Sequence, residues 1–146
     1  MGVPQLGGDP NANLYYPLKR DVLDRVPEIS RGEFLPDRAK AEQLRATFDP
    51  IRLGIETGPE SPTLTITWYR QTPDDWFRVN YSDPNTGFHA GWHQDEDHPD
   101  LGPAHFQYTD EGETDYQLFS FEHETPSLRL WEIIDHLFSD VLPLQG

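Results

Sequence analysis

Short runs in which apolar and polar side chains alternate dominate the chain from residue 51 to residue 122. In Leu64–Trp68 every second residue is apolar, which is the period of a β-strand with one buried face. Turn-forming segments such as SDPNTG separate the runs. Six strands are predicted in this way, over residues 51–55, 64–68, 76–81, 88–93, 104–109 and 116–122. Because the connections are short, we expect sequential strands to pair as hairpins in an antiparallel meander.

Apolar residues at helical spacing occur on both sides of these runs. The clearest case follows Thr125, which can cap a helix that has Pro126 at its first position and an apolar stripe as far as Pro143. Two further helices are predicted over residues 17–26 and 35–48. Packing the C-terminal helix on one face of the sheet gives an α+β fold, with the N-terminal helices beside it or across an edge.

The length of 146 residues predicts a single domain, in which residues 1–13, rich in Gly, Pro and Asn, form a flexible leader. No apolar run approaches the roughly 20 residues that cross a bilayer, and the first residues lack the features of a signal peptide. We therefore expect a cytoplasmic protein without a membrane partner. The absence of cysteine excludes disulfides, thiolate metal ligands and a cysteine nucleophile.

The charge is strongly acidic, with 26 acidic and 11 basic residues and a formal net charge of −15. Aromatic residues make up 12% of the chain, which is too many for a disordered acidic tail. Only Lys19 and Lys40 are lysines. This composition is typical of a halophile's high-salt cytosol, where salt screens carboxylate repulsion to about 3 Å. The alternative is an acidic face that imitates nucleic acid or binds a basic partner.

The two halves of the chain differ in charge. Residues 1–70 carry nine cations and ten acids, whereas residues 71–146 carry sixteen acids and only two cations, Arg78 and Arg129. Either the acidic half supplies the solvated outer strands, or the near-neutral half docks a partner, nucleic acid included. Nonspecific binding to a phosphate backbone is disfavoured, because it needs clustered cations.

Histidines gather on the polar side of two predicted strands. His89 and His93 lie on one, and His105 lies on the next with Gln107, so a hairpin would place them on one face. The connecting loop adds titratable residues, which are Asp95, Glu96, Asp97, His98 and Asp100.

Three interpretations of this region stay open. The histidines can be ordinary residues of a polar sheet face. Alternatively, His105 or His98 acts as a general acid or base in phosphodiester cleavage, with Arg78 supplying positive charge. A divalent metal bound by His89 and His93 is the third interpretation, although positions i and i+4 of a strand lie about 13 Å apart.

The remaining aromatic and histidine residues have simpler interpretations. Trp68, Trp92 and Trp131 are predicted to lie in the core. Trp76 is predicted to share the polar face with Arg78, where it either stacks on a base or is covered by a helix. His123 and His136 are expected to be hydrogen-bonded edge or surface residues, not metal ligands.

Four segments of the C-terminal half resemble the TumE family, small proteins regarded as the toxin partners of toxin–antitoxin modules. The matching segments are Tyr81-Ser82-Asp83, Asp97-His98-Pro99-Asp100-Leu101, Ala104-His105-Phe106 and Thr125-Pro126-Ser127-Leu128. The first histidine of the family's paired motif is replaced by Asp97, and its later histidine cluster is reduced to His105. The resemblance implies an intracellular effector that is held in check by an antitoxin protein, with His98 and His105 as the transferable positions.

The leading hypothesis is therefore a TumE-like toxin component that acts on RNA as a ribonuclease-type hydrolase. His98 and His105 would be central, Asp97 and Arg78 would support them, and the antitoxin would be encoded by an adjacent gene. The alternative is a noncatalytic acidic protein-binding module, and a metalloenzyme with a divalent metal is a third hypothesis. No other cofactor is expected, and exposed strand edges permit a homodimer.

Overall fold

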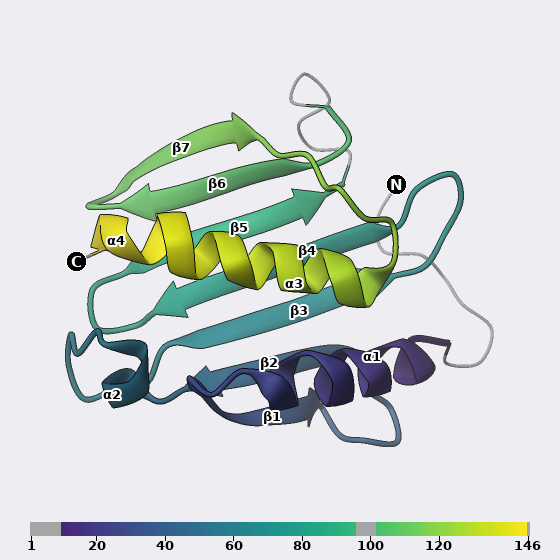
Figure 1. The fold of residues 1–146 in the computed structure, drawn as a ribbon, viewed down its shortest axis with the longest axis horizontal. Coiled ribbons are helices and arrows are strands. Elements are labelled where there is room, and N and C mark those ends of the chain that lie inside the picture. The colour runs from purple at the N-terminus through teal and green to yellow at the C-terminus, as the bar shows by residue number, and fades with distance from the viewer. Residues whose placement is uncertain (1–9, 96–101, 146) are drawn as a thin grey trace.

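The computed structural model describes residues 10–95 and 102–145, which form one antiparallel sheet with helices on a single face (Figure 1). The sheet has seven strands in the order β1-β2-β3-β4-β5-β6-β7. Their bounds are β1 (Ile29–Leu35), β2 (Gln43–Phe48), β3 (Thr63–Tyr69), β4 (Trp76–Asp83), β5 (Phe88–Gln94), β6 (His105–Asp110) and β7 (Glu113–Leu118). The α+β class and the antiparallel meander predicted from the sequence are confirmed.

The two longest helices, one near each end of the chain, pack side by side on the sheet (Figure 1). Helix α1 (Pro10–Asp21) and a 3₁₀ turn, η1 (Leu23–Arg25), lie over β1 and β2, and α2 (Pro50–Leu53) is a single turn. The C-terminal helix crosses the middle of the sheet; it consists of α3 (Pro126–His136), a π-helical turn η3 (Leu137–Val141) and α4 (Leu142–Gln145). None of the described helices has the length and apolar character needed to cross a membrane.

The core lies between the helices and the face of the sheet beneath them. Alternate residues of the strands point into it, because a strand presents every second side chain to the same face. Burying an apolar side chain of this size stabilises the fold by about 1.5–3 kcal/mol. Fully buried members include Leu64, Ile66, Trp68, Phe77, Val79, Tyr81 and Trp92 from the strands, with Leu18, Leu130, Ile133 and Leu137 from the helical segments.

The first helix begins earlier than predicted. Pro17 was expected to start it, but Pro17 lies inside α1, which begins at Pro10 within the segment expected to be a leader. Tyr15 is the anchor that the sequence did not reveal. Its hydroxyl accepts the N–H of Trp68 at 3.0 Å and donates to the carbonyl oxygen of Glu42 at 2.8 Å, which fixes α1 to the sheet. Residues 1–9 lie outside the described residues.

The predicted helix over residues 35–48 is wrong. This segment forms the end of β1, a turn and β2, because Leu44, Ala46 and Phe48 are buried at every second position while Ala39 is exposed. The turn is held by Asp37, whose carboxylate accepts the N–H of Ala39 at 2.8 Å and that of Lys40 at 2.9 Å.

The predicted strand over residues 51–55 is also wrong. The carboxylate of Asp49 accepts the N–H of Ile51 at 3.0 Å, Pro50 occupies the first helical position, and Gly54 ends the turn with φ of 80°. These are the start and stop signals of a helix, here the short α2. Ile51 is 76% exposed, so its alternation with Leu53 and Ile55 does not reflect a buried face.

The last strand is shifted towards the N-terminus relative to the prediction. Glu111 and Gly112 have φ of 52° and 83°, which makes them the two central residues of a type I′ turn. The turn is shorter than the predicted DEGETD loop, so β7 begins at Glu113 and ends at Leu118. Phe119 and Phe121 follow the strand and pack against the core.

The C-terminal helix starts where predicted and ends later. Thr125 is its N-cap by position: its carbonyl oxygen accepts the N–H of Arg129 at 3.0 Å, but its side chain makes no capping bond. Pro143 does not end the helix, because α4 continues to Gln145. Trp131 was expected in the core and is instead 36% exposed.

Candidate functional site

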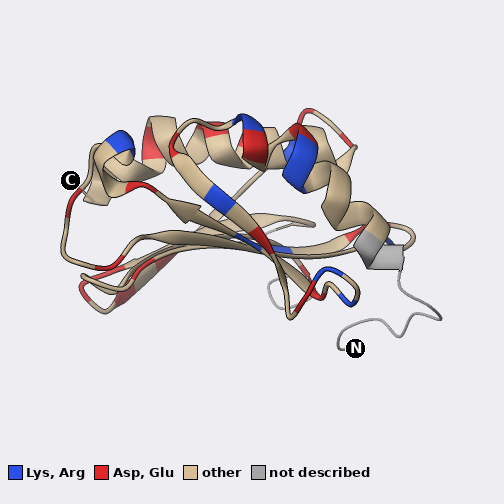
Figure 2. Ribbon diagram, turned by 90° about the horizontal axis from the view of Figure 1, so that it is seen from below, with Lys and Arg blue, Asp and Glu red and all other residues tan. Residues whose placement is uncertain are grey.

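The sheet face opposite the helices, called the open face below, is covered by no described helix (Figure 2). The register of the strands arranges its side chains in rows, because residues paired across strands point to the same side. One row consists of Thr67, Arg78, His93, His105 and Leu118, each opposite the next on the neighbouring strand. The central part of this row is the candidate site.

Two histidines from adjacent strands face each other at its centre. The ring centroids of His93 on β5 and His105 on β6 are 5.2 Å apart, with the rings nearly perpendicular at 81°. His105 is buried, with 2% of its surface exposed, and His93 is half-buried.

The hydrogen bonds of the two rings define where a proton can be taken up. Nε2 of His93 lies 2.7 Å from Oδ1 of Asn80, and Nε2 of His105 lies 3.1 Å from Oε1 of Gln107. A ring nitrogen next to an amide oxygen carries the proton and donates it. Each imidazole is thus oriented by a side-chain amide, and an oriented imidazole suits general acid–base chemistry.

Gly91 makes room for the bond between Asn80 and His93. These two side chains meet above Gly91, which pairs with Asn80 across the strands and is buried. A Cβ atom at position 91 would lie 2.6 Å from Oδ1 of Asn80 and 2.7 Å from Nε2 of His93. Glycine is therefore required at this position for the amide to hold the imidazole.

A cation lies next to the histidine pair and is fixed from two sides. Nε of Arg78 donates to Oδ2 of Asp95 at 2.9 Å, and its guanidinium carbon lies 5.1 Å from the centroid of the Trp76 ring. The Asp95 side chain is 2% exposed and that of Arg78 is 39% exposed. A buried carboxylate needs such a partner, so Asp95 holds Arg78 in place while the guanidinium still reaches the surface.

The open face has a different charge balance from the rest of the molecule. The register places four charged strand residues on this face, and Asp95 lies beside them. The cations are Arg31, Arg45 and Arg78, and the acidic residues are Glu33 and Asp95. Although the chain carries a net charge of −15, this set has no excess of acidic groups. An anionic ligand would therefore meet less repulsion here than at the acidic turns and edges.

The structure brings together some of the residues proposed from the sequence. The prediction that His93, His105 and Gln107 gather on one face is confirmed, and Arg78 joins them. His89 shares the face but lies four residues from His93, opposite Ser82 and Thr109. Asp97 and His98 lie outside the described residues.

Sequence reasoning missed how Arg78 is held and what orients His93. Asp95 was assigned to the acidic loop, and Asn80 and Gly91 were given no role. The turn after Asp83 was the sequence signal that could have revealed this arrangement. It pairs Asp83 with Phe88, and five residues further from the turn on each strand Arg78 lies opposite His93. Trp76 lies on the open face beside Tyr69, with ring centroids 5.6 Å apart. Of the two alternatives for Trp76, cover by a helix is therefore wrong for the part of the chain that the structure describes.

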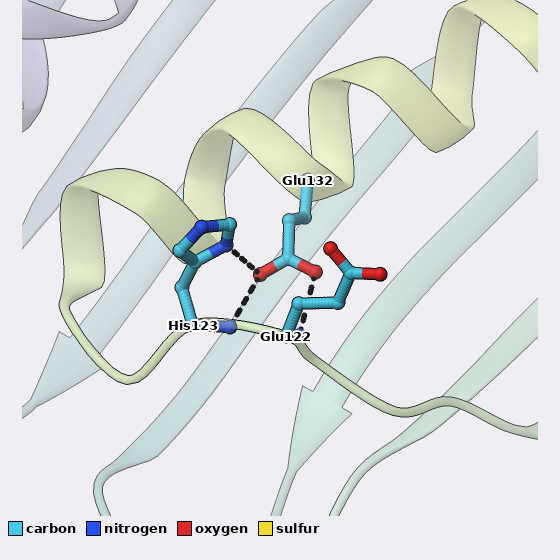
Figure 3. Close-up of side chains that lie close together, drawn as sticks. All are labelled: Glu122, His123 and Glu132. Carbon is cyan, nitrogen blue, oxygen red and sulfur yellow. Dashed lines mark hydrogen bonds and ion pairs between the residues drawn. The ribbon is translucent and has the colours of Figure 1, made fainter.

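A second group of titratable residues lies where the chain enters α3, and Figure 3 shows its three side chains. Each of Glu122, His123 and Glu132 offers one atom that could bind a metal ion, and these three atoms lie within 4.8 Å of one another. Glu132 accepts the N–H of Glu122 at 2.9 Å and that of His123 at 3.2 Å, and its carboxylate also lies 3.2 Å from Nδ1 of His123. These bonds fasten the connection between β7 and α3 to the helix, in agreement with the hydrogen-bonded edge role expected for His123.

His136 is a partly buried residue of the interface between α3 and the sheet. Its Nδ1 accepts the indole N–H of Trp92 at 2.9 Å, and its ring centroid lies 4.7 Å from that of Phe106 and 5.0 Å from that of Phe119. Burial lowers the pKa of His136 below its usual 6.5, against the opposing influence of Asp140 and Asp135. The side chain therefore acts as a neutral hydrogen-bond acceptor.

Comparisons of the chain with protein-family models, with curated proteins and with solved structures found no match.

Proposed function

We propose that this chain is an RNA-directed effector of the toxin type and that the row through Arg78, His93 and His105 is its active site. The observation that carries the proposal is the direct opposition of the two histidines beside a fixed arginine, on a face whose charges are balanced in a very acidic protein. The resemblance to the TumE family supports the proposal, since His105 belongs both to this row and to one of the segments that resemble the family.

The proposed reaction is cleavage of RNA by its own ribose hydroxyl. His93 is the more exposed histidine of the pair, and its imidazole accepts the proton of a 2′-hydroxyl. The 2′-oxygen forms a bond to the adjacent phosphorus while the bond from phosphorus to the 5′-oxygen breaks. His93 returns the same proton to that 5′-oxygen, so the products are a 2′,3′-cyclic phosphate and a 5′-hydroxyl end, with no net gain or loss of protons.

The neighbouring residues have supporting roles in this scheme. Arg78 offsets the negative charge that builds up on the phosphoryl oxygens, which is the usual role of a fixed guanidinium in phosphoryl chemistry. Asn80 and His105 position the His93 ring from two sides. Trp76 and Tyr69 offer aromatic surface for an unpaired base, a contact that tolerates high salt better than phosphate contacts do.

Induction in a salt-loving host tests this proposal. Expression of the gene alone should arrest growth, and co-expression of the adjacent gene, the proposed antitoxin, should relieve the arrest. His93→Gln should abolish toxicity, whereas His89→Gln is the matched control, because it removes a histidine from the same face of the same strand outside the cluster. Unimpaired growth from a well-expressed chain, or equal toxicity of both variants, would contradict the proposal.

A second candidate is the noncatalytic acidic protein-binding module. The burial of His105 favours it, because a residue 2% exposed is more easily explained as support for a binding surface than as a group that contacts substrate. On this proposal the chain forms a stable complex with a partner protein in molar salt. His93→Gln leaves that complex unchanged, and the protein cleaves no RNA. Pull-down combined with light scattering distinguishes the two.

A further inference from the structure

The outer strand β7 is unusually accessible. It lies at one end of the strand order, and all six residues from Glu113 to Leu118 are exposed. In contrast, most of β1 at the opposite edge is half-buried. An exposed edge strand presents backbone N–H and C=O groups with which the strand of another molecule can pair.

The turn determines which backbone groups point outwards. In a hairpin with a two-residue type I′ turn, the residues that flank the turn, here Asp110 and Glu113, form the first hydrogen-bonded pair. Bonded and non-bonded pairs then alternate along the strands. Thr114 and Leu118 fall on non-bonded positions, so their N–H and C=O groups are directed away from β6 and towards the edge.

The two faces of β7 have different chemistry. On the helix side of the sheet, Glu113 and Asp115 border a surface hollow of about 530 Å³ that is also lined by Tyr108, Asp110 and Glu111. No ion pair involves these four carboxylates within the described chain, and the sequence has no lysine or arginine between Arg78 and Arg129. On the open face, Leu118 is 67% exposed and Tyr116 is 44% exposed.

We propose that β7 binds an extended segment of another protein by strand addition, and that basic and apolar residues alternate in this segment. The basic residues would face Glu113 and Asp115, and the apolar residues would face Tyr116 and Leu118, because an added strand continues both faces of the sheet. This interaction surface adjoins the proposed active site, because Leu118 lies opposite His105, but the inference does not depend on that site.

The acidic side chains of β7 disfavour a second copy of this chain as the partner. Antiparallel pairing of two β7 strands about Asp115 would place the two Asp115 carboxylates opposite each other, with Glu113 of each copy diagonal to Asp115 of the other, and like charges across a strand pair are destabilising. A basic segment has the opposite effect, because it neutralises carboxylates that have no cation of their own in this part of the chain.

A binding measurement on the full-length protein tests the inference. The probe is a synthetic peptide with alternating lysine and valine, and the control peptide has the same composition with its lysines and valines in two blocks. In 0.5 M KCl we expect at least a tenfold preference for the alternating peptide, with NMR shift changes concentrated on β7. Equal affinity for the two peptides, shift changes elsewhere, or dimerisation of the chain through β7 would overturn it.

Two variants separate strand addition from general electrostatics. Thr114→Pro removes one outward N–H and no backbone bond to β6, and should weaken binding of the alternating peptide about tenfold. It also removes the 2.7 Å hydroxyl bond to Thr109, which Thr114→Val removes alone and without an expected loss of peptide binding. Asp115→Lys should weaken it at least as much, whereas Asp135→Lys, an equal charge change on the exposed side of α3, should not. Equal losses in the two lysine variants, or unchanged binding by Thr114→Pro, would contradict the proposal.

Discussion

At the scale of single residues, the hydrogen bond between Trp92 and His136 makes the fold sensitive to pH. The indole N–H can only donate to an unprotonated Nδ1, and burial lowers the pKa of His136. The unfolded chain therefore binds more protons than the folded chain as the pH falls below about 6.5. The stabilising contribution is present above that pH and is lost as the pH falls towards the lower pKa of the folded state.

The test is the free energy of unfolding at fixed molar KCl between pH 8 and pH 5.5. Wild-type protein should lose more stability over this range than His136→Gln, whose amide can still accept a hydrogen bond but does not titrate. The other histidines are common to both proteins, so the difference reports on His136. Equal pH dependence in the two proteins would show that the bond to Trp92 is not linked to protonation.

A second prediction at the scale of single residues concerns the substitution Gly91→Ala. A methyl group at position 91 would overlap the ends of the Asn80 and His93 side chains, which can move away without a shift of the backbone. Gly91→Ala should therefore leave the free energy of unfolding within about 1 kcal/mol of wild type, while it breaks the bond between Asn80 and His93.

A double-mutant cycle measures whether this bond matters for function. If Gly91→Ala and Asn80→Ala act by releasing the same imidazole, their losses of RNA cleavage will not add, and the double variant will be about as impaired as either single variant. Additive losses, or full activity of Gly91→Ala, would show that the orientation of His93 is not what Gly91 provides.

At the scale of elements, the hairpin between β6 and β7 has a turn residue that is not the preferred one. Glu111 adopts φ of 52°, a left-handed conformation that asparagine tolerates better, and Asn-Gly is the favoured pair in a type I′ turn. Glu111→Asn should raise the melting temperature, whereas Gly112→Ala should lower it and cost about 1 kcal/mol. Calorimetry in molar KCl checks both, and a melting temperature that Glu111→Asn leaves unchanged or lowers would contradict this account of the turn.

The strands and helices also show where the sequence pattern alone does not distinguish a helix from a strand. Strands β3, β4 and β5 were predictable because each has buried residues at every second position between clear turns. The β1–β2 segment was mistaken for a helix because its alanines and leucines fit a period of 3.6 as well as a period of two over so short a stretch. Only pairing with β3, a contact between distant residues, decides between them.

The candidate site was predictable to the extent that it depends on strand alternation. The common face of His93, His105 and Gln107 follows from two neighbouring strands. The contact between Arg78 and Asp95 does not, because it requires the register of β4 against β5 and a residue beyond the end of a strand. The bond of Asn80 over Gly91 depends on the same register.

At the scale of the whole molecule, charge and architecture divide the surface into parts with different uses. The excess of acid lies in the second half of the chain, and the strand β7 from that half exposes an acidic edge. The described strand residues of the open face have balanced charge and include the histidine pair, while the helices occupy the other side of the sheet (Figure 2). On the two proposals, the open face binds an anionic ligand and the β7 edge binds a basic partner.

Cleavage of RNA by the purified protein tests the central claim most directly. In molar KCl, single-stranded RNA should be cut to products with 2′,3′-cyclic phosphate ends, and DNA of the same sequence should stay intact because it lacks the 2′-hydroxyl. His93→Gln should be slower by about 10² to 10⁴-fold, the usual contribution of a general acid–base group, and His89→Gln should match wild type. Intact RNA with folded wild-type protein, or equal cleavage by His93→Gln, would contradict the account.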